Sequence, residues 1–138
     1  MGAKVDDQAR EQARAKLLEA EAAYQQARAD DYVTRLVRDS AMVEAHRAGI
    51  SSREISELLG GLGQPNVVRA RRRAETRREA VPDGLLSPAD AVRESGLGPR
   101  EFLAAVREGR VRPVEVYPGV HAFRPEDVRQ LAAAGRGR

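Results

Sequence analysis

The first part of the chain has the apolar spacing of an amphipathic helix. Residues 5–48 contain neither proline nor glycine and are dominated by Ala, Glu, Gln, Arg and Leu, which are good helix formers. Apolar side chains recur every three or four positions, at Ala9, Ala13, Leu17, Ala20, Tyr24 and Ala27. This narrow, mostly alanine stripe fits either a solvated helix or one side of an antiparallel helix pair.

A wider apolar face follows over Tyr32–Arg47. Asp30 and Asp31 could cap a new helix here, and a single unbroken helix fits the pattern equally well. The residues expected to face inward are Tyr32, Val33, Leu36, Val37, Met42 and Val43. We therefore assign residues 1–30 to an N-terminal helix and residues 31–80 to a helical domain.

Two shorter helices are predicted to complete this domain. Ser51 and Glu54 have the spacing of a capping box, which starts a helix over Ser52–Leu59. Its expected buried residues are Ile55, Leu58 and Leu59. The turn Gly60–Gly63 then leads into a helix over Gln64–Ala80, whose expected apolar side consists of Val67, Ala70 and Ala74.

The remainder of the chain is predicted to form a small mixed domain over residues 86–134, after a linker at 81–85 that contains Pro82 and Gly84. The expected elements are helices over Pro88–Glu94 and Pro99–Glu108, two short strands around Pro118-Gly119, and a helix that opens at Pro125. Residues 135–138 are expected to form a flexible tail. The fold class is therefore mainly α, with a long N-terminal helical segment, two shorter helices around a glycine-rich turn, and a small C-terminal domain containing one β-hairpin.

Charge is concentrated in one part of the chain. Residues 51–80 contain seven arginines and four glutamates, so their net charge of +3 equals that of all 138 residues. A local excess of this kind favours a polyanionic partner. Because there is no cysteine and the two histidines lie far apart, we expect neither a disulfide nor a metal site, and no cofactor.

Residues 48–60, with Val67 and Ala70, resemble the helix-turn-helix of bacterial resolvases, sigma factors and small regulators. Gly60 matches the turn glycine, and the likeness extends over about residues 41–73. The turn is one residue longer than is usual, and Ser56 stands where alanine is commoner. The resemblance implies that the helix over Gln64–Ala80 reads the major groove of double-stranded DNA.

The candidate DNA-binding residues follow from their places on this helix. Gln64 and Asn66 lie at its N-terminus and can bond adenine edges, and Arg69 and Arg72 on its outer face can bond guanine. The expected phosphate contacts are Arg71, Arg73, Arg77 and Arg78, with Arg53 from the preceding helix. The alternative is a solvated basic helix on which Glu75 and Glu79 pair with neighbouring arginines.

The segment Leu85–Leu131 resembles the excisionase and MerR-type winged-helix group. The likeness rests on residues 86–96, 99–106, 108–111 and 124–128. It implies a second reading helix that carries Arg100, and a hairpin preceded by Arg112, which is able to reach phosphate. The alternative is a module that contacts protein or forms a dimer.

Three functions remain open from the sequence. The first is a sequence-specific DNA-binding transcriptional regulator, and the second is an excisionase-like or partition accessory protein. The third is a protein-interaction adaptor that binds through the N-terminal helix or the winged-helix domain. An enzyme is not expected, because no nucleophile–base pair stands out. We expect a cytoplasmic, nucleoid-associated protein without a membrane segment, either a homodimer or a monomer with two reading modules.

Overall fold

The computed structural model describes residues 2–136, and the side chains of residues 7–135. It is mainly helical, with 71% helix and a two-stranded antiparallel sheet near the C-terminus, so the predicted class is confirmed at this level. The elements are α1 (Gly2–Arg47), α2 (Ser52–Leu58), α3 (Gln64–Glu79), α4 (Pro88–Ser95), α5 (Pro99–Arg107), β1 (Val114–Tyr117), β2 (Val120–Ala122) and α6 (Pro125–Arg136).

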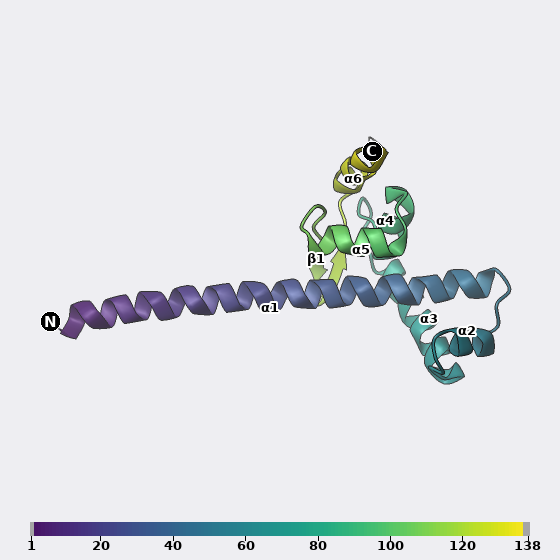
Figure 1. Ribbon diagram of the computed structural model, residues 1–138, viewed down its shortest axis with the longest axis horizontal. Helices are drawn as coiled ribbons and strands as arrows, with labels where there is room; N and C mark the ends of the chain where they lie inside the picture. Colours follow the sequence, from purple (N-terminus) through teal and green to yellow (C-terminus); the bar gives the residue numbers. More distant parts are fainter. Residues whose placement is uncertain (1, 137–138) are drawn as a thin grey trace.

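Helix α1 is a single unbroken helix of 46 residues. It crosses almost the full length of the molecule as a rod, and the other elements gather on its C-terminal half (Figure 1). Asp30 and Asp31 do not interrupt it, so the continuous alternative holds. Every residue from 7 to 28 is exposed, and Ala29 is the first buried residue among the described side chains.

Two hydrophobic cores lie against this second half of α1. Val33 and Val37 join one core with Phe102 and Phe123, and Met42 joins a smaller one. The smaller core is completed by Ile55, Val67 and Ala70. The predicted inward face is confirmed, because five of its residues are buried and Tyr32 is partly buried. Helix α1 therefore supplies one wall to both cores.

The prediction for α2 is wrong in part. Ile55 is buried as expected, but Leu58 and Leu59 are 74% and 44% exposed. Helix α2 has only seven residues and ends at Leu58. Leu62 from the following turn packs against the small core together with Ile50. The turn thus supplies the apolar contact that the sequence pattern assigned to the end of the helix.

The C-terminal elements form the larger core. Strands β1 and β2 pair in antiparallel register, with Val114 opposite Ala122 and Glu115 opposite His121. The Phe102 ring on α5 meets the Phe123 ring edge-on, at a centroid distance of 5.3 Å. Helix α6 continues to Arg136, so residues 135 and 136 are helical where a tail was expected, and residues 137–138 lie outside the described part.

Candidate nucleic-acid interface

Helix α2 begins at the predicted cap. The Ser51 hydroxyl accepts a hydrogen bond from the Glu54 amide at 3.2 Å, which satisfies one of the free N–H groups at the start of the helix. Leu59 follows the helix and its amide bonds back to the Ile55 carbonyl at 3.1 Å. This short helix is therefore well defined at both ends, and it holds the beginning of the turn toward α3.

Ser56 anchors the turn between α2 and α3. It is buried, and its hydroxyl accepts a hydrogen bond from the Gly63 amide at 2.7 Å. Its carbonyl accepts another from the Gly61 amide at 2.8 Å. Gly63 precedes α3, offers no side-chain cap and has a φ of 98° that favours glycine. The serine that departs from the usual pattern thus fixes the place where α3 begins.

Several arginines of α3 are engaged by side chains of other elements of the protein. Arg73 donates through Nε and Nη2 to the buried Asp39 carboxylate of α1, at 3.0 and 2.9 Å. Arg71 donates to the Ser52 hydroxyl at 3.1 Å, which links α3 to α2. Arg78 forms an ion pair with Asp90 at 2.9 Å. These contacts orient α3, so fewer of its arginines are free than the sequence suggested.

The outer face of α3 has a different character. Arg69 and Arg72 are exposed, and with Gln64, Pro65 and Val68 they surround a shallow, open depression. Arg69 donates through Nε to the Pro65 carbonyl at 3.3 Å. Within the described part of the chain, neither guanidinium forms an ion pair. Two cationic groups of α3 therefore point to solvent beside its N-terminus.

The side-chain amides of Gln64 and Asn66, at this end of α3, have different surroundings. The Asn66 Nδ2 donates to the Leu62 carbonyl at 2.7 Å, so that amide helps to hold the turn. Gln64 is exposed and lies in the rim of the depression. Arg53, which was expected to reach phosphate, is exposed on α2 and forms a loose ion pair with Glu57 at 3.4 Å.

Arg77 lies apart from this outer face. It lines a cavity of about 240 Å³ between α1, α3 and the β-hairpin, together with Arg28, Tyr32 and His121. Burial raises the pKa of Tyr32, and the nearby Arg77 charge opposes that shift. Burial also lowers the pKa of His121, although Glu115 acts in the opposite direction. Arg77 therefore belongs to the junction with the C-terminal elements.

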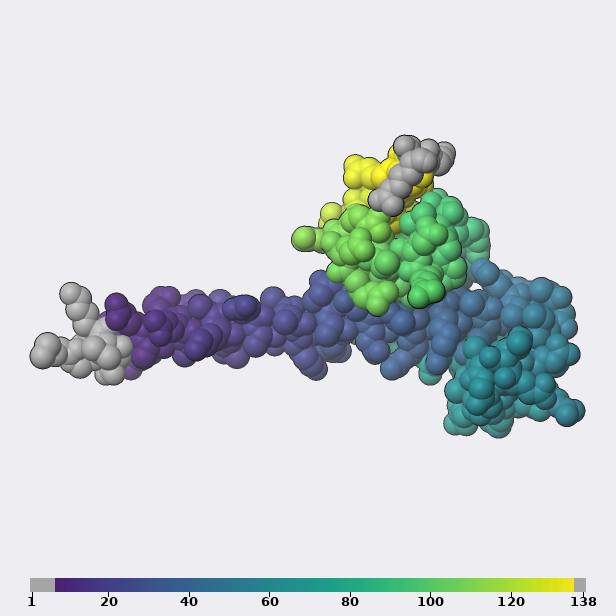
Figure 2. Space-filling model, in the orientation of Figure 1, coloured from purple at the N-terminus to yellow at the C-terminus, as the bar shows by residue number. Residues whose placement is uncertain are grey.

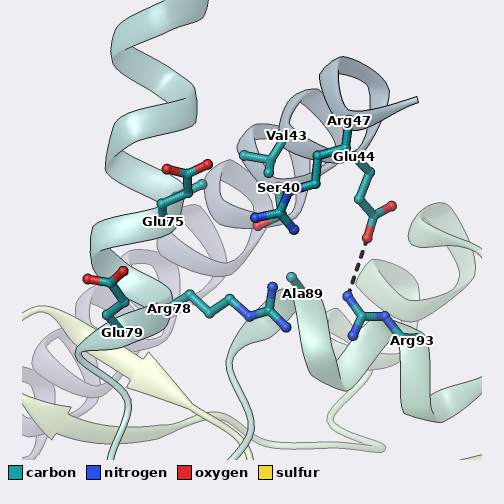
Figure 3. Close-up of a pocket in the computed structure, with 10 residues that line it drawn as sticks. Ser40, Val43, Glu44, Arg47, Glu75, Arg78, Glu79, Ala89 and Arg93 are labelled. Carbon is teal, nitrogen blue, oxygen red and sulfur yellow. Dashed lines mark ion pairs between the residues drawn. The ribbon is translucent and has the colours of Figure 1, made fainter. Parts of the chain in front are cut away.

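The C-terminal half of α3 meets α1 and α4 around a second cavity, of about 260 Å³ (Figure 3). Arg93 of α4 reaches Glu44 of α1 at 3.6 Å. The lining residues from α3 include the acidic Glu75 and Glu79 as well as Arg78. Because acidic and basic groups alternate here, this half of the helix is less suited to phosphate than its N-terminal half.

Arg100 and Arg112 do not join the α3 surface. Both are exposed, on α5 and in the segment before β1. Helix α5 lies on one side of α1, and α2 with the start of α3 lies on the other (Figure 1). The structure therefore groups Gln64, Arg69 and Arg72, and it leaves the two C-terminal candidates on a separate surface.

Asp39 is a structurally important residue that was not among those predicted from the sequence. This carboxylate is fully buried between Arg38 and Arg73. Its position, three residues after Leu36 and four before Val43, puts an acidic side chain on the apolar face of α1. That placement is a usable signal, because a buried acid needs a basic partner from another element.

Comparison with known proteins identifies no family. No protein-family model, curated protein or solved structure matches the chain. Within the described residues there is no group of three His, Cys, Asp or Glu side chains that could hold a metal ion. In the same part of the chain, the helices are too short or too polar to span a membrane.

Proposed function

We propose that the protein binds double-stranded DNA through α2, the turn and α3, as a helix-turn-helix regulator whose α3 enters the major groove. The observation that carries the proposal is the division of the α3 arginines. Arg71, Arg73 and Arg78 are held by protein groups and Arg77 lines the cavity beside the hairpin, whereas Arg69 and Arg72 are exposed on the outer face and form no ion pair among the described residues. A helix of this kind fits the major groove and presents guanidinium groups to base edges.

Each part of the outer face has a role in this proposal. Arg69 and Arg72 bond guanine, and Gln64 bonds adenine at the end of α3 that carries the positive helix dipole. Val68 lies between them and offers an apolar surface to a thymine methyl group. Arg53, at the start of α2, contacts backbone phosphate, as helix N-termini commonly do.

The arginines held within the protein have an indirect role. Arg71 and Arg73 fix the angle at which α3 leaves the body of the protein, through Ser52 and Asp39. Arg100 and Arg112 lie on another surface, and the proposal does not require them. The C-terminal winged-helix domain is proposed as a support for α1 and α3 through the Arg78–Asp90 pair.

The experiment is a comparison of DNA affinity between two double variants. DNA sequences selected for binding to the full chain are used in fluorescence anisotropy, at several salt concentrations. In Arg69→Gln/Arg72→Gln we expect at least a roughly tenfold loss of affinity and loss of preference for the selected sequence, because two base contacts disappear.

Arg124→Gln/Arg129→Gln is the matched control. It removes the same charge from two exposed positions, one just before α6 and one within it, and α6 lies across α1 from the start of α3 (Figure 1). We expect it to retain sequence preference. An equal loss in both variants would show a general charge effect, and retention of preference without Arg69 and Arg72 would refute the assigned reading face.

A further inference from the structure

Most of the N-terminal half of α1 is a bare helix: among its described side chains none before Ala29 is buried, and Arg28, at the end of this half, lines the cavity beside the hairpin. Residues 7–28 are all exposed, including Leu17 at 69% and Tyr24 at 57%. In the space-filling view this half projects from the body as a bare rod (Figure 2). Helices in proteins are stabilised mostly by packing an apolar face. The exposed apolar side chains therefore indicate that another helix packs on this part of α1.

The apolar side chains of this rod have the spacing of a coiled coil. From Ala13 the intervals are four, three, four and three residues, which is the heptad pattern. The stripe consists of Ala13, Leu17, Ala20, Tyr24 and Ala27. At 100° per residue it lies about half a turn around the helix from the buried Ala29 and from Val33, which belongs to the larger core. A second helix can therefore pack on the stripe without displacing that core.

We infer that the stripe packs against the same stripe of a second copy of this chain, in an antiparallel coiled coil. One alignment fits the side-chain sizes. When Leu17 faces Ala20 of the second copy, Tyr24 faces Ala13 of the second copy, so every large residue meets a small one. The Arg10 side chain then faces Ala27 of the second copy and avoids another arginine.

The charges beside the stripe select the same alignment. It places Arg14 against Glu21 of the second copy, twice by symmetry, and Asp7 against Arg28 of the second copy. If one helix is shifted along the other by one heptad in one direction, Arg14 faces Arg28 of the second copy and Glu21 faces Glu21 of the second copy. A shift in the other direction makes Arg14 face Arg14 of the second copy, and Asp7 face Glu21 of the second copy. Only the first alignment opposes unlike charges throughout.

A parallel pair fits less well. It sets Arg10 against itself at a core position and places Ala13 and Ala20 opposite their own copies, where little apolar surface meets. Within the described residues, Arg14 and Glu21 form no ion pair along their own helix; Glu21 accepts only an amide bond from Gln25, at 2.8 Å. Both charges therefore remain available to a second copy.

The test is sedimentation of the full chain without DNA, together with three variants. We expect a dimer for the natural chain. Arg14→Glu and Glu21→Arg should each raise the dimer dissociation constant roughly tenfold, because each creates like-charge pairs. The double variant Arg14→Glu/Glu21→Arg exchanges the two charges and should restore the dissociation constant to within about threefold.

Glu19→Arg is the control, because Glu19 is exposed and lies outside the stripe and its flanking positions. It should leave the dissociation constant unchanged, and circular dichroism should show equal helix content in all variants. A monomeric natural chain, or a double variant that remains as weak as the single ones, overturns the inference. Since no DNA is present, the result is independent of the proposed DNA binding.

Discussion

At the scale of single residues, Asp39 determines how two helices meet. Its carboxylate has no exposed surface and accepts hydrogen bonds from Arg38 of α1 and Arg73 of α3. A buried carboxylate is costly unless it is paired, so this residue orders the arginines around it. The same contact explains why Arg73, a candidate for DNA from the sequence alone, faces the protein.

Replacement of Asp39 should therefore destabilise the fold. For Asp39→Ala we expect the free energy of unfolding to fall by about 2–4 kcal/mol, because Arg73 loses its partner in a half-buried place. Asp31→Ala is the control, since Asp31 is exposed and pairs with Arg35 at 3.4 Å; a change below about 0.5 kcal/mol is expected. Urea unfolding measures both values, and equal changes would contradict the role of Asp39.

At the scale of elements, the turn between α2 and α3 is ordered by one serine. Gly60, Gly61 and Gly63 have positive φ angles, which glycine adopts without strain. Glycine residues can also adopt many other backbone conformations. The Ser56 hydroxyl and carbonyl accept hydrogen bonds from the Gly63 and Gly61 amides, and these bonds select the conformation that the turn adopts.

The variant Ser56→Ala tests this element. It leaves the Gly63 amide without its partner, so we expect a loss of about 1–2 kcal/mol of unfolding free energy. The affinity for DNA should fall as well, because α3 begins at Gln64, directly after the freed glycine. Thr76→Ala removes an exposed hydroxyl from α3 and should change neither the unfolding free energy nor the DNA affinity. If Ser56→Ala behaves like Thr76→Ala in both measurements, the turn is ordered by other contacts.

At the scale of the whole molecule, α1 connects everything else. It contributes Met42 to the small core, and Val33 and Val37 to the larger core. It also meets the hairpin, where Tyr32 and His121 pack with ring centroids 5.2 Å apart. The C-terminal elements are therefore attached to α1 through a buried, titratable group.

This attachment should depend on pH. Burial lowers the pKa of His121 in the folded protein, whereas the unfolded chain has the ordinary value of about 6.5. Below that pH the unfolded chain takes up a proton that the folded protein does not, so stability is lost as the pH falls. We expect a slope of up to about 1.4 kcal/mol per pH unit below about pH 6.5.

The comparison of His121→Gln with His46→Gln isolates this effect. His121→Gln should flatten the slope, and His46→Gln, which changes an exposed histidine, should keep it. Thermal unfolding at each pH measures the slope. An unchanged slope in His121→Gln would assign the pH dependence to the carboxylates.

Local features of the structure were largely predictable from the sequence. The cap at Ser51 and the positions of the helices follow from side chains a few residues apart. Burial of Val67, Ala70 and Ala74 also followed from helical spacing. These features depend on contacts within one helix or turn, which the order of residues already specifies.

The identity of the candidate surface depended on distant contacts. The sequence by itself determined that α3 is basic and that its apolar side faces inward. Only the tertiary structure decided that Arg73 turns to Asp39, 34 positions away, and that Arg71 turns to Ser52. Arginine side chains are long and flexible, so their direction is settled by partners from other elements. Helical spacing already put Arg69 and Arg72 on the outer face, but it could not show that Arg71 and Arg73, expected at phosphate, are held by other helices.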